Sequence, residues 1–557
     1  MGPGIPNIAR RSKALTGGLA LLCGLAGFAA ALAITAPPGP GLDPDSASYL
    51  GAAESLAAGS GYRIPIAVWS SPDSSGPLSH FPPGFSTAIA LPVALGAPAV
   101  QSARVIDALA AGIALGVATY AVMLAAGIVA GLALGGALVV TSAFVDVQLS
   151  ILSEPLFIAC FALLILALGA PRSTWTGTRP AELRGLLGAA LVAAIAVLVR
   201  YAGIAATGAV ALWALLPGGR VRDRLVRAGV VLLPTIVLFG AWVVRTHFVS
   251  GPGSIRQLAF YGGFGPTLAT GRDTIVHWIV PWSGDDPLPY QGWFALAALV
   301  SLGALVALGV RALVRQHRSG AASERSRRAQ RTLTFCALLA ASYVVVLVLS
   351  RVLADPGIPF DQRILAPLLF VVEVATAVAL SYWWRGARVR WRIPVALGLL
   401  SWGVAAAMDV QNDVSWALEH GVDFASDEWR YSRLVQWART TGRDRPLYSN
   451  WPVVIYFHLH RHAWELPVSN SDSATLGAFG DTLRARHGAV LAFDAPSPGY
   501  APPDSLARVL GLQQLMRFPD GSIFVARAAD SSTARAGIRE SSRAATRSAV
   551  ASRGRSR

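Results

Sequence analysis

The chain has 557 residues, of which 54% are hydrophobic and only 14% are charged. Because ordinary soluble domains carry about 25% charged residues, this composition excludes an ordinary soluble protein and indicates a membrane protein. The net charge of +16 raises the question of a nucleic-acid partner. Its basic residues are gathered between apolar segments, which favours a topological signal and no nucleic-acid partner.

Apolar segments that can cross a hydrocarbon core of about 30 Å as helices recur along the chain. They lie at 14–36, 103–125, 127–145, 149–170, 186–199, 203–217, 228–246, 291–311, 332–352, 363–384 and 393–409. We predict a mainly α, polytopic membrane protein of about eleven transmembrane helices. The start of the chain also fits a cleavable signal peptide, but the run from Ala14 to Ala36 is longer than a usual signal segment, which favours a retained helix.

Five basic clusters separate these segments. They are Arg10, Arg11 and Lys13; Arg172, Arg179 and Arg184; Arg220, Arg222, Arg224 and Arg227; Arg311 to Arg331; and Arg385 to Arg392. With eleven spans and a cytoplasmic N-terminus, every cluster lies on the cytoplasmic side, as the positive-inside rule requires. The segments 37–102, 247–290, 353–362 and 410–557 then lie outside. We predict an integral protein of the bacterial inner (cell) membrane with an extracytoplasmic active site.

Smaller features within the apolar segments have structural interpretations. The cysteines indicate neither a disulfide framework nor a thiolate metal site, because all three lie inside the segments: Cys23, Cys160 and Cys336. Glycines at four-residue spacing predict close helix packing: Gly127, Gly131 and Gly135. The absence of Walker and dinucleotide motifs disfavours a transporter with its own nucleotide site.

The sequence changes character after the last apolar segment. We predict a transmembrane domain over 1–409, a small α/β extracytoplasmic domain over 410–528, and a disordered basic tail over 529–557. The α/β domain is expected to contain helices at 428–441, 453–459 and 504–510 and strands at 446–450, 488–494 and 522–528.

The first outer loop, 37–102, is the first place to search for chemistry. It contains several ionisable residues: Asp43, Asp45, Glu54, Asp73 and His80. Asp45 begins a predicted helix with Tyr49, Ala53 and Leu56 on one side. Its carboxylate fits either a helix N-cap or dipole partner or a catalytic group at the membrane surface. The residues themselves leave both interpretations open.

Further charged residues lie near the outer ends of spans. A Glu154 carboxylate that faced the bilayer interior would have a high free-energy cost, so this residue is either solvated or functional. A group of arginines could bind a lipid phosphate through their planar fork of donors or extend to headgroups: Arg200, Arg245, Arg351 and Arg363. Arg363 is the preferred phosphate ligand, with Asp361 as its alternative partner.

Three histidines alternate near the end of the chain. In a continuous helix, His458 and His462 would share a face at metal-ligand spacing, with His460 between them. No glutamate of an HExxH motif accompanies them, and a solvated histidine-rich edge is the favoured interpretation.

The order of these motifs resembles the polytopic GT-C glycosyltransferases. It comprises Pro44-Asp45 with Tyr49, Gly59-Ser-Gly-Tyr62, His80-Phe-Pro-Pro-Gly84, Arg104 before a span, and Ser153-Glu154-Pro155. The resemblance extends over roughly residues 14–384. Within this superfamily, the chain is similar to the protein O-mannosyltransferases, the lipid A aminoarabinose transferases and their bacterial relatives.

The resemblance implies a set of site residues. Asp45 corresponds to the catalytic aspartate, Asp43 is its neighbouring competitor, and Glu154 belongs to an acidic-Pro pair. Tyr49, Tyr62 and His80 belong to the substrate loop. Ser46 stands where an acidic residue is frequent, and His80-Phe81 where a lysine can occur. These departures leave metal use open; no cofactor is required, and a divalent metal is not indicated.

The implied activity is transfer of a sugar from a polyprenyl-phosphate donor to an extracytoplasmic acceptor hydroxyl on a lipid, glycan or protein. Asp45 would accept the hydroxyl proton. Arg363, Arg351 and Arg200 would stabilise the leaving phosphate. The alternatives are a non-enzymatic lipid or glycan transporter and a polysaccharide polymerase. The expected partners are the lipid-linked sugar, the acceptor and the bilayer.

Overall fold

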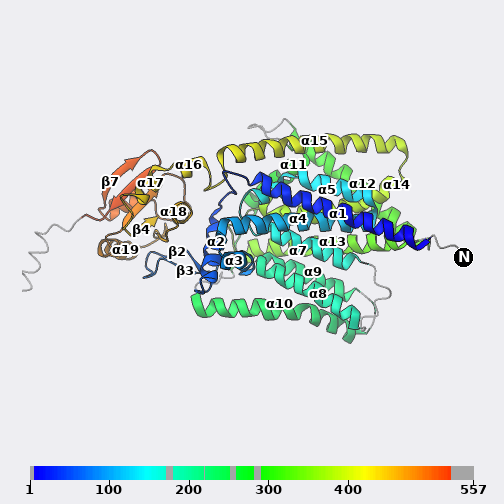
Figure 1. Cartoon of the computed structure of the whole chain (residues 1–557), viewed down its shortest axis with the longest axis horizontal. Helices are drawn as coiled ribbons and strands as arrows, with labels where there is room; N and C mark the ends of the chain where they lie inside the picture. The colour runs from blue at the N-terminus through cyan, green and yellow to red at the C-terminus, as the bar shows by residue number, and fades with distance from the viewer. Residues whose placement is uncertain are drawn as a thin grey trace, which may run out of the picture. The chain divides into compact units, whose positions relative to one another are not determined.

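The computed structural model describes residues 5–170, 180–216, 218, 220–250, 259–281, 290–320, 322–497 and 499–527 (Figure 1). The chain divides into two compact units. The helical unit consists of Met1–Ile64 and Pro77–Asp427, and the α/β unit consists of Pro65–Gly76 and Glu428–Arg557. A segment of the first outer loop therefore belongs to the α/β unit.

Seven helices of the described chain are long and apolar enough to cross a membrane. They are α1 (Ile5–Ile34), α4 (Ala99–Ala126), α10 (Val221–Ser250), α12 (Gln291–Arg318), α13 (Glu324–Leu353), α14 (Gln362–Gly386) and α15 (Val389–His420). The mainly α, polytopic fold is confirmed.

The other expected spans are helical but shorter or bent. α5 (Ile128–Val140) and α6 (Ser142–Leu149) form one apolar pair bent by 55°. α7 (Glu154–Gly169), α8 (Pro180–Val199) and α9 (Ile204–Leu215, after the 3₁₀ turn η1, Tyr201–Gly203) complete the eleven expected segments. By length and composition, the described residues provide seven spans, or eight with the bent pair. The count of eleven stays a prediction.

The remaining helices of this unit are α2 (Pro44–Ala57), α3 (Gly84–Ala94) and α11 (Gly265–Ile279). The two-residue strands β1 (Arg63–Ile64) and β3 (Gly76–Pro77) pair with each other.

Helix α4 is the buried centre of the helical unit. Glycines allow its neighbours to approach its backbone: a Cβ on Gly112 would lie 2.7 Å from the carbonyl oxygen of Gly24 in α1. A Cβ on Gly131 of α5 would lie 2.8 Å from the carbonyl oxygen of Thr119. Close packing is thus confirmed for Gly131. Gly127 instead joins α4 to α5 at φ 106°, a conformation that favours glycine.

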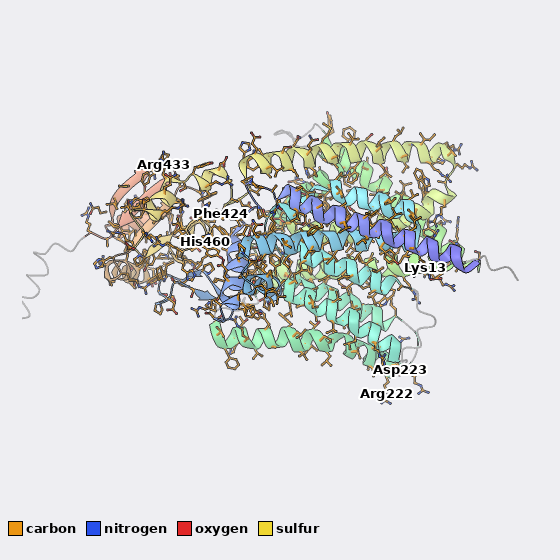
Figure 2. All side chains as sticks on the ribbon, in the orientation of Figure 1. Lys13, Arg222, Asp223, Phe424, Arg433 and His460 are labelled. Carbon is orange, nitrogen blue, oxygen red and sulfur yellow. The ribbon has the colours of Figure 1, made fainter. Side chains whose placement is uncertain are left out.

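Basic residues gather at one end of the helical unit. Lys13 and Arg222 lie at the end opposite Phe424 (Figure 2). Arg331 donates to the carbonyl oxygen of Ala170, and Arg385 to that of Ala126, both at carboxyl ends of helices. The side chains of Arg10, Arg11, Arg172 and Arg179 are outside the described residues. The described clusters agree with the expected grouping, whereas their cytoplasmic location stays a prediction.

The α/β unit contains a six-stranded sheet in the order β2-β5-β4-β6-β8-β7. Its strands are β2 (Ile66–Ala67), β4 (Leu447–Ser449), β5 (Ala463–Glu465), β6 (Ala489–Phe493), β7 (Gln513–Phe518) and β8 (Gly521–Val525). β2, β5, β4 and β6 are parallel, while β8 pairs antiparallel with β6 and β7. The helices are α16 (Asp427–Arg430), α17 (Arg433–Arg439), α18 (Pro452–Leu459), α19 (Ser473–Ala485) and α20 (Pro503–Val509).

The sequence-based elements of this unit agree with the structure only in part. The three expected strands and the helices near 453–459 and 504–510 are present. The expected helix at 428–441 is instead two short helices, because Ser432 caps a new helix by accepting from the Val435 amide. The boundary at residue 410 also differs, since α15 continues to His420. The predicted tail, 529–557, lies wholly outside the described residues.

Candidate active site

The first acidic pair of the site is positioned by the beginning of α2. Asp43 is the N-cap, and its Oδ1 accepts from the Asp45 amide at 2.9 Å. Pro44 occupies the first turn, where a missing N–H has no cost. Ser46 donates to the carbonyl oxygen of Ile151 at 2.8 Å, which ties the helix start to the segment before α7. Capping therefore belongs to Asp43, and the Asp45 carboxylate is available for other contacts.

Glu154 begins α7 and is completely buried. Pro155 follows it in the first turn, where the fixed φ of proline favours a helix start. A carboxylate at a helix N-terminus is stabilised by the helix dipole. Burial of its charge nevertheless requires cationic partners.

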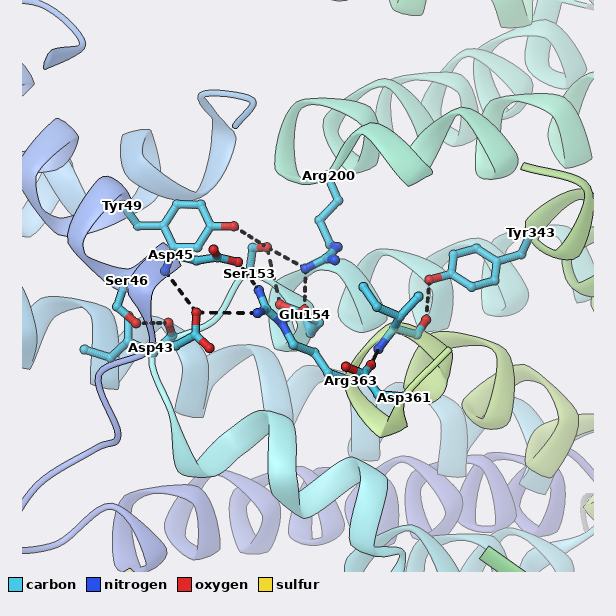
Figure 3. A network of polar contacts seen from close by, with 12 residues as sticks. Asp43, Asp45, Ser46, Tyr49, Ser153, Glu154, Arg200, Tyr343, Asp361 and Arg363 are labelled. Carbon is cyan, nitrogen blue, oxygen red and sulfur yellow. Dashed lines mark hydrogen bonds and ion pairs between the residues drawn. The ribbon is translucent and has the colours of Figure 1, made fainter. Parts of the chain in front are cut away.

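Arg363 connects the carboxylates across the site. Its Nη2 lies 2.5 Å from Asp45 Oδ2, its Nη1 lies 3.5 Å from Asp43 Oδ1, and its Nε donates to Glu154 Oε1 (Figure 3). It stands in the first turn of α14, where a cation is unfavourable for the helix dipole. The carboxylates offset that cost. Each of the three guanidinium nitrogens of Arg363 thus contacts an acidic residue.

Arg200 provides the second guanidinium from the break between α8 and η1. Its Nη1 pairs with the same Glu154 oxygen, and it also donates to Ser153 Oγ at 3.1 Å. The Tyr49 hydroxyl lies 3.3 Å from that Ser153 oxygen (Figure 3). Among the described residues, the side-chain contacts of Arg200 all come from Nη1. Its Nε and Nη2 donors are therefore available to a ligand.

The other predicted partner of Arg363 has a different role. Asp361 is the N-cap of α14 and accepts from the Ile364 amide at 2.9 Å. No ion pair joins it to Arg363 among the described residues. Burial raises the pKa of Asp361, while the hydrogen bond from Ile364 acts in the opposite direction. The Asp361–Arg363 pair, considered above as the alternative to phosphate binding, is replaced by pairs of Arg363 with Asp45, Asp43 and Glu154.

The environment of Asp43 favours its protonated form. Burial, together with the negative charge of Asp45, raises the pKa of Asp43 from 3.8 to about 6, and the Arg363 guanidinium acts in the opposite direction. At neutral pH the cluster holds three carboxylates and two guanidiniums, so its formal charge is negative.

Two of the other predicted arginines lie in separate surroundings. Arg351 donates to Thr267 Oγ1 at 2.9 Å and to the Gly263 carbonyl oxygen at 3.0 Å. Arg245 donates to the carbonyl oxygens of Leu78 and Tyr62 at 2.6 and 3.0 Å. None of these hydrogen bonds goes to the acidic cluster.

The substrate-loop residues are also divided. Tyr49 contacts Ser153 in the cluster. The Tyr62 hydroxyl lies 2.8 Å from Thr87 Oγ1, and the ring of His80 packs edge-on against Phe81 at 4.8 Å. The contact with Ser153 places Tyr49 in the polar network of the cluster.

The alternating histidines do not form the metal-ligand spacing considered above. α18 ends at Leu459, and His460 adopts a left-handed conformation at φ 49°. His462 therefore lies beyond the helix and does not share a helical face with His458.

A divalent metal does not fit the acidic cluster as it stands. Carboxylate oxygens suit such ions, but here the Arg363 guanidinium lies among the oxygens of Asp43, Asp45 and Glu154. Across the described ranges, no group of three or more His, Cys, Asp or Glu residues has the geometry to hold a metal ion.

Sequence reasoning missed the neutral residues that support the cluster. Ser153 bridges Tyr49 and Arg200. Tyr343 donates to the Ile364 carbonyl oxygen at 2.8 Å in the first turn of α14. Ser153 was adjacent to a selected acidic residue, which was an available signal. Tyr343 lies within an apolar run, and its role depends on a contact that the linear pattern does not contain.

Comparisons with known proteins give only remote structural likenesses. No family model matches the chain, and no curated protein matches it. ArnT from Cupriavidus metallidurans bound to undecaprenyl phosphate is 14% identical, with a TM-score of 0.42 over 92% of this chain and 98% of that one. The oligosaccharyltransferase AglB from Archaeoglobus fulgidus, in complex with an inhibitory peptide and a dolichol-phosphate, is 11% identical, with a TM-score of 0.49 over 85% and 69%. With scores below 0.5, the assignment of function depends on the side chains described above.

Proposed function

We propose that this protein is a membrane glycosyltransferase that transfers a sugar from a polyprenyl-phosphate donor to an extracytoplasmic acceptor hydroxyl. The observation that carries the proposal is the placement of Asp45. Its carboxylate is 26% exposed and contacts Arg363, which shares Glu154 with Arg200. A partly accessible base thus stands beside a second guanidinium that has unused donors. The motif order described above supplies the reaction class.

In the proposed reaction, Asp45 accepts the proton of the acceptor hydroxyl as the oxygen attacks the anomeric carbon of the sugar. The bond between that carbon and the phosphate oxygen breaks, and its electron pair leaves with the polyprenyl phosphate. The products are the glycosylated acceptor and the lipid phosphate. The acceptor proton remains on Asp45 until it is released to solvent.

Arg200 is the better placed residue for the leaving phosphate. Its Nε and Nη2 can donate to phosphate oxygens, and preorganised donors stabilise the charge that develops there. Arg363 would have to release a carboxylate before it could contact phosphate, because its three nitrogens already face acidic residues. Glu154 would act by holding the two guanidiniums in position. Arg351 would act elsewhere.

The test is sugar transfer by purified protein in nanodiscs. A panel of undecaprenyl-phosphate-linked pentoses and hexoses is incubated with candidate lipid, glycan and peptide acceptors, and release of undecaprenyl phosphate is measured. Loss of a positioned base costs about 10²–10⁴ in rate, so Asp45→Asn should lower turnover by that factor. Glu54→Gln, on the same helix but outside the cluster, is the matched control.

Three results would reject this assignment. Wild-type turnover in Asp45→Asn would remove the base from its role, and loss in Asp43→Asn alone would transfer that role to Asp43. Movement of the intact lipid-linked sugar across the bilayer without release of lipid phosphate would indicate a transporter. Successive additions from a lipid-linked oligosaccharide would indicate a polymerase.

A further inference from the structure

The α/β unit contains a cavity of about 260 Å³ at the carboxyl ends of two neighbouring parallel strands. Asn450 follows β4, and the segment from Asp494 to Ser497 follows β6. Additional polar lining comes from Tyr500, Asp504, Arg517 and Ser522. All of these residues belong to the α/β unit, so the cavity is separate from the Asp45 cluster.

The topology of the sheet makes this position a crevice. From β4 the chain passes through α18 to β5 on one side, and then through α19 to β6 on the other side of β4. The connection after β6 leads away toward β7 and β8. Loops that leave adjacent parallel strands in opposite directions create the switch point at which open α/β sheets bind ligands.

The wall of the crevice is rigidly held. Asn450 is only 1% exposed; its Nδ2 donates to the Phe493 carbonyl oxygen at 2.8 Å, and its Oδ1 accepts from the Phe493 amide at 2.9 Å. The same Nδ2 lies 3.2 Å from Ser497 Oγ. The Trp451 indole also donates to the Ala495 carbonyl oxygen at 3.3 Å. These contacts fix the loop after β6 without a ligand.

The charges of the crevice select against anions. Arg517 and Asp494 form two parallel hydrogen bonds, at 3.0 and 2.8 Å, and Arg517 also donates to Ser522 Oγ at 3.0 Å. Asp504 adds a second acidic group to the lining. The lining therefore holds two carboxylates and one guanidinium, and three of the five N–H donors of that guanidinium are used by Asp494 and Ser522. A phosphate would meet net negative charge, whereas hydroxyl groups can donate to the carboxylates and accept from Arg517.

We propose that this crevice binds a neutral, polyhydroxylated ligand of the size of one sugar ring, such as a terminal pyranoside of a glycan. Its volume is slightly below the range of about 300–1,000 Å³ that is typical for drug-sized ligands, which suits a single ring. The adjacent Asp494 carboxylate and Arg517 guanidinium supply hydrogen-bond acceptors and donors to hydroxyl groups. This binding site does not depend on the proposed transfer reaction.

The test uses the full-length protein in nanodiscs, because residues 65–76 belong to the α/β unit. Saturation-transfer difference NMR is recorded with a panel of methyl glycosides of common hexoses and with glucose 1-phosphate as the anionic probe. At least one neutral glycoside should give saturation-transfer signals that level off as its concentration rises. Glucose 1-phosphate should bind at least about tenfold more weakly.

Variants locate the binding. Asp494→Ala should weaken glycoside binding by about tenfold, the loss of one good hydrogen-bonding partner. Asp504→Lys changes an exposed lining residue and should weaken it without affecting folding, which keeps the test decisive if Asp494→Ala does not fold. Asp481→Ala is the matched control, since it breaks an exposed Arg–Asp pair elsewhere in the same unit. Asp45→Asn should bind like the wild type.

Several results would overturn the proposal. The first is the absence of a saturation-transfer signal from every glycoside with folded wild-type protein. The second is tighter binding of glucose 1-phosphate than of the glycosides. The third is unchanged glycoside binding in both lining variants. Loss of binding in Asp45→Asn would assign the glycoside to the helical unit. The first three results do not bear on whether Asp45 supports sugar transfer, so the two proposals can fail independently.

Discussion

Arg200 and Arg363 form ion pairs with the same oxygen of Glu154, although one follows α8 and the other lies in the first turn of α14. Two guanidiniums repel each other, and the buried carboxylate between them compensates for that repulsion. Arg363 also pairs with Asp45, so a continuous chain of ion pairs joins Arg200, Glu154, Arg363 and Asp45.

Glu154→Gln should destabilise the helical unit strongly. The amide retains the shape but leaves two partly buried guanidiniums without their shared anion, and removal of one partner from a buried ion pair costs about 3–5 kcal/mol. We expect a lower unfolding temperature in detergent, together with lost activity. Glu54→Gln is the control with the same chemical change. An unaltered unfolding temperature in Glu154→Gln would contradict the structural role given to this carboxylate.

Arg200→Lys should raise the donor KM and leave the acceptor KM nearly unchanged. Lysine keeps the charge but lacks the planar fork, and each charge-assisted hydrogen bond contributes about 1.5–3 kcal/mol, which corresponds to a factor of roughly 10–150. Donor titrations would measure the change. Arg351→Lys is the control, because its contacts are with Thr267 and Gly263. A larger donor defect in Arg351→Lys would relocate the phosphate.

Arg363→Lys should behave differently from Arg200→Lys. A single ammonium cannot replace three nitrogens that face three carboxylates. We therefore expect reduced kcat and a lower unfolding temperature in addition to any change in donor KM. A pure donor-KM effect with normal stability would show that Arg363 contacts phosphate directly, as the sequence first indicated.

The stability of the wild type should decrease as pH rises from about 4 to 6. The pKa of Asp43 is raised from 3.8 to about 6 in the folded protein, so folding favours the protonated form. The associated stability is present below pH 3.8 and is lost as pH rises through 6. At about 1.36 kcal/mol per pKa unit, the change is on the order of 3 kcal/mol. Unfolding temperatures between pH 4 and 7 would measure it.

Asp43→Asn isolates this contribution. Asparagine can still cap α2 but does not titrate, so the slope of unfolding temperature against pH should become smaller over the same interval. The same slope in variant and wild type would assign the pH dependence to other groups.

The membrane orientation can be tested with reporters. A reporter that is active only outside the cytoplasm should be active when fused after Arg527 and inactive when inserted after Arg318, beside the basic end of α12. The prediction depends on the positive-inside bias of the basic clusters. The reverse pattern in well-expressed fusions would overturn the predicted orientation and the extracytoplasmic location of the active site.

The helices and the separate α/β fold could be predicted because each depends on a local pattern. Every apolar run coincides with a helix or with the bent helix pair, although only seven or eight of these described segments qualify as spans, and polar interruptions selected Asp45, Glu154 and Arg363. The pairing of Asp45 with Arg363 could not be read from the pattern, since 318 residues separate them. Asp361 is only two residues from Arg363 and was therefore the nearer partner by sequence. Its carboxylate instead accepts from the Ile364 amide.

The strand β2 shows a second limit of local patterns. This strand contains only Ile66 and Ala67, so it is too short for an alternating pattern to be recognised in the sequence. Their parallel pairing with β5 depends on a partner near residue 463. The loop that holds Asp45 therefore also contributes to a sheet whose other strands all lie beyond residue 440.

That early strand has a consequence for biosynthesis. Ile66 is synthesised about 400 residues before its partner Ala463, so the edge of the sheet is completed by polypeptide that left the ribosome long before the rest of the domain. A fragment beginning at Glu428 would expose β5 as an unpaired edge, and such edges promote intermolecular strand pairing. Attempts to produce the soluble part alone should therefore add residues 65–76 as a tethered or separate peptide.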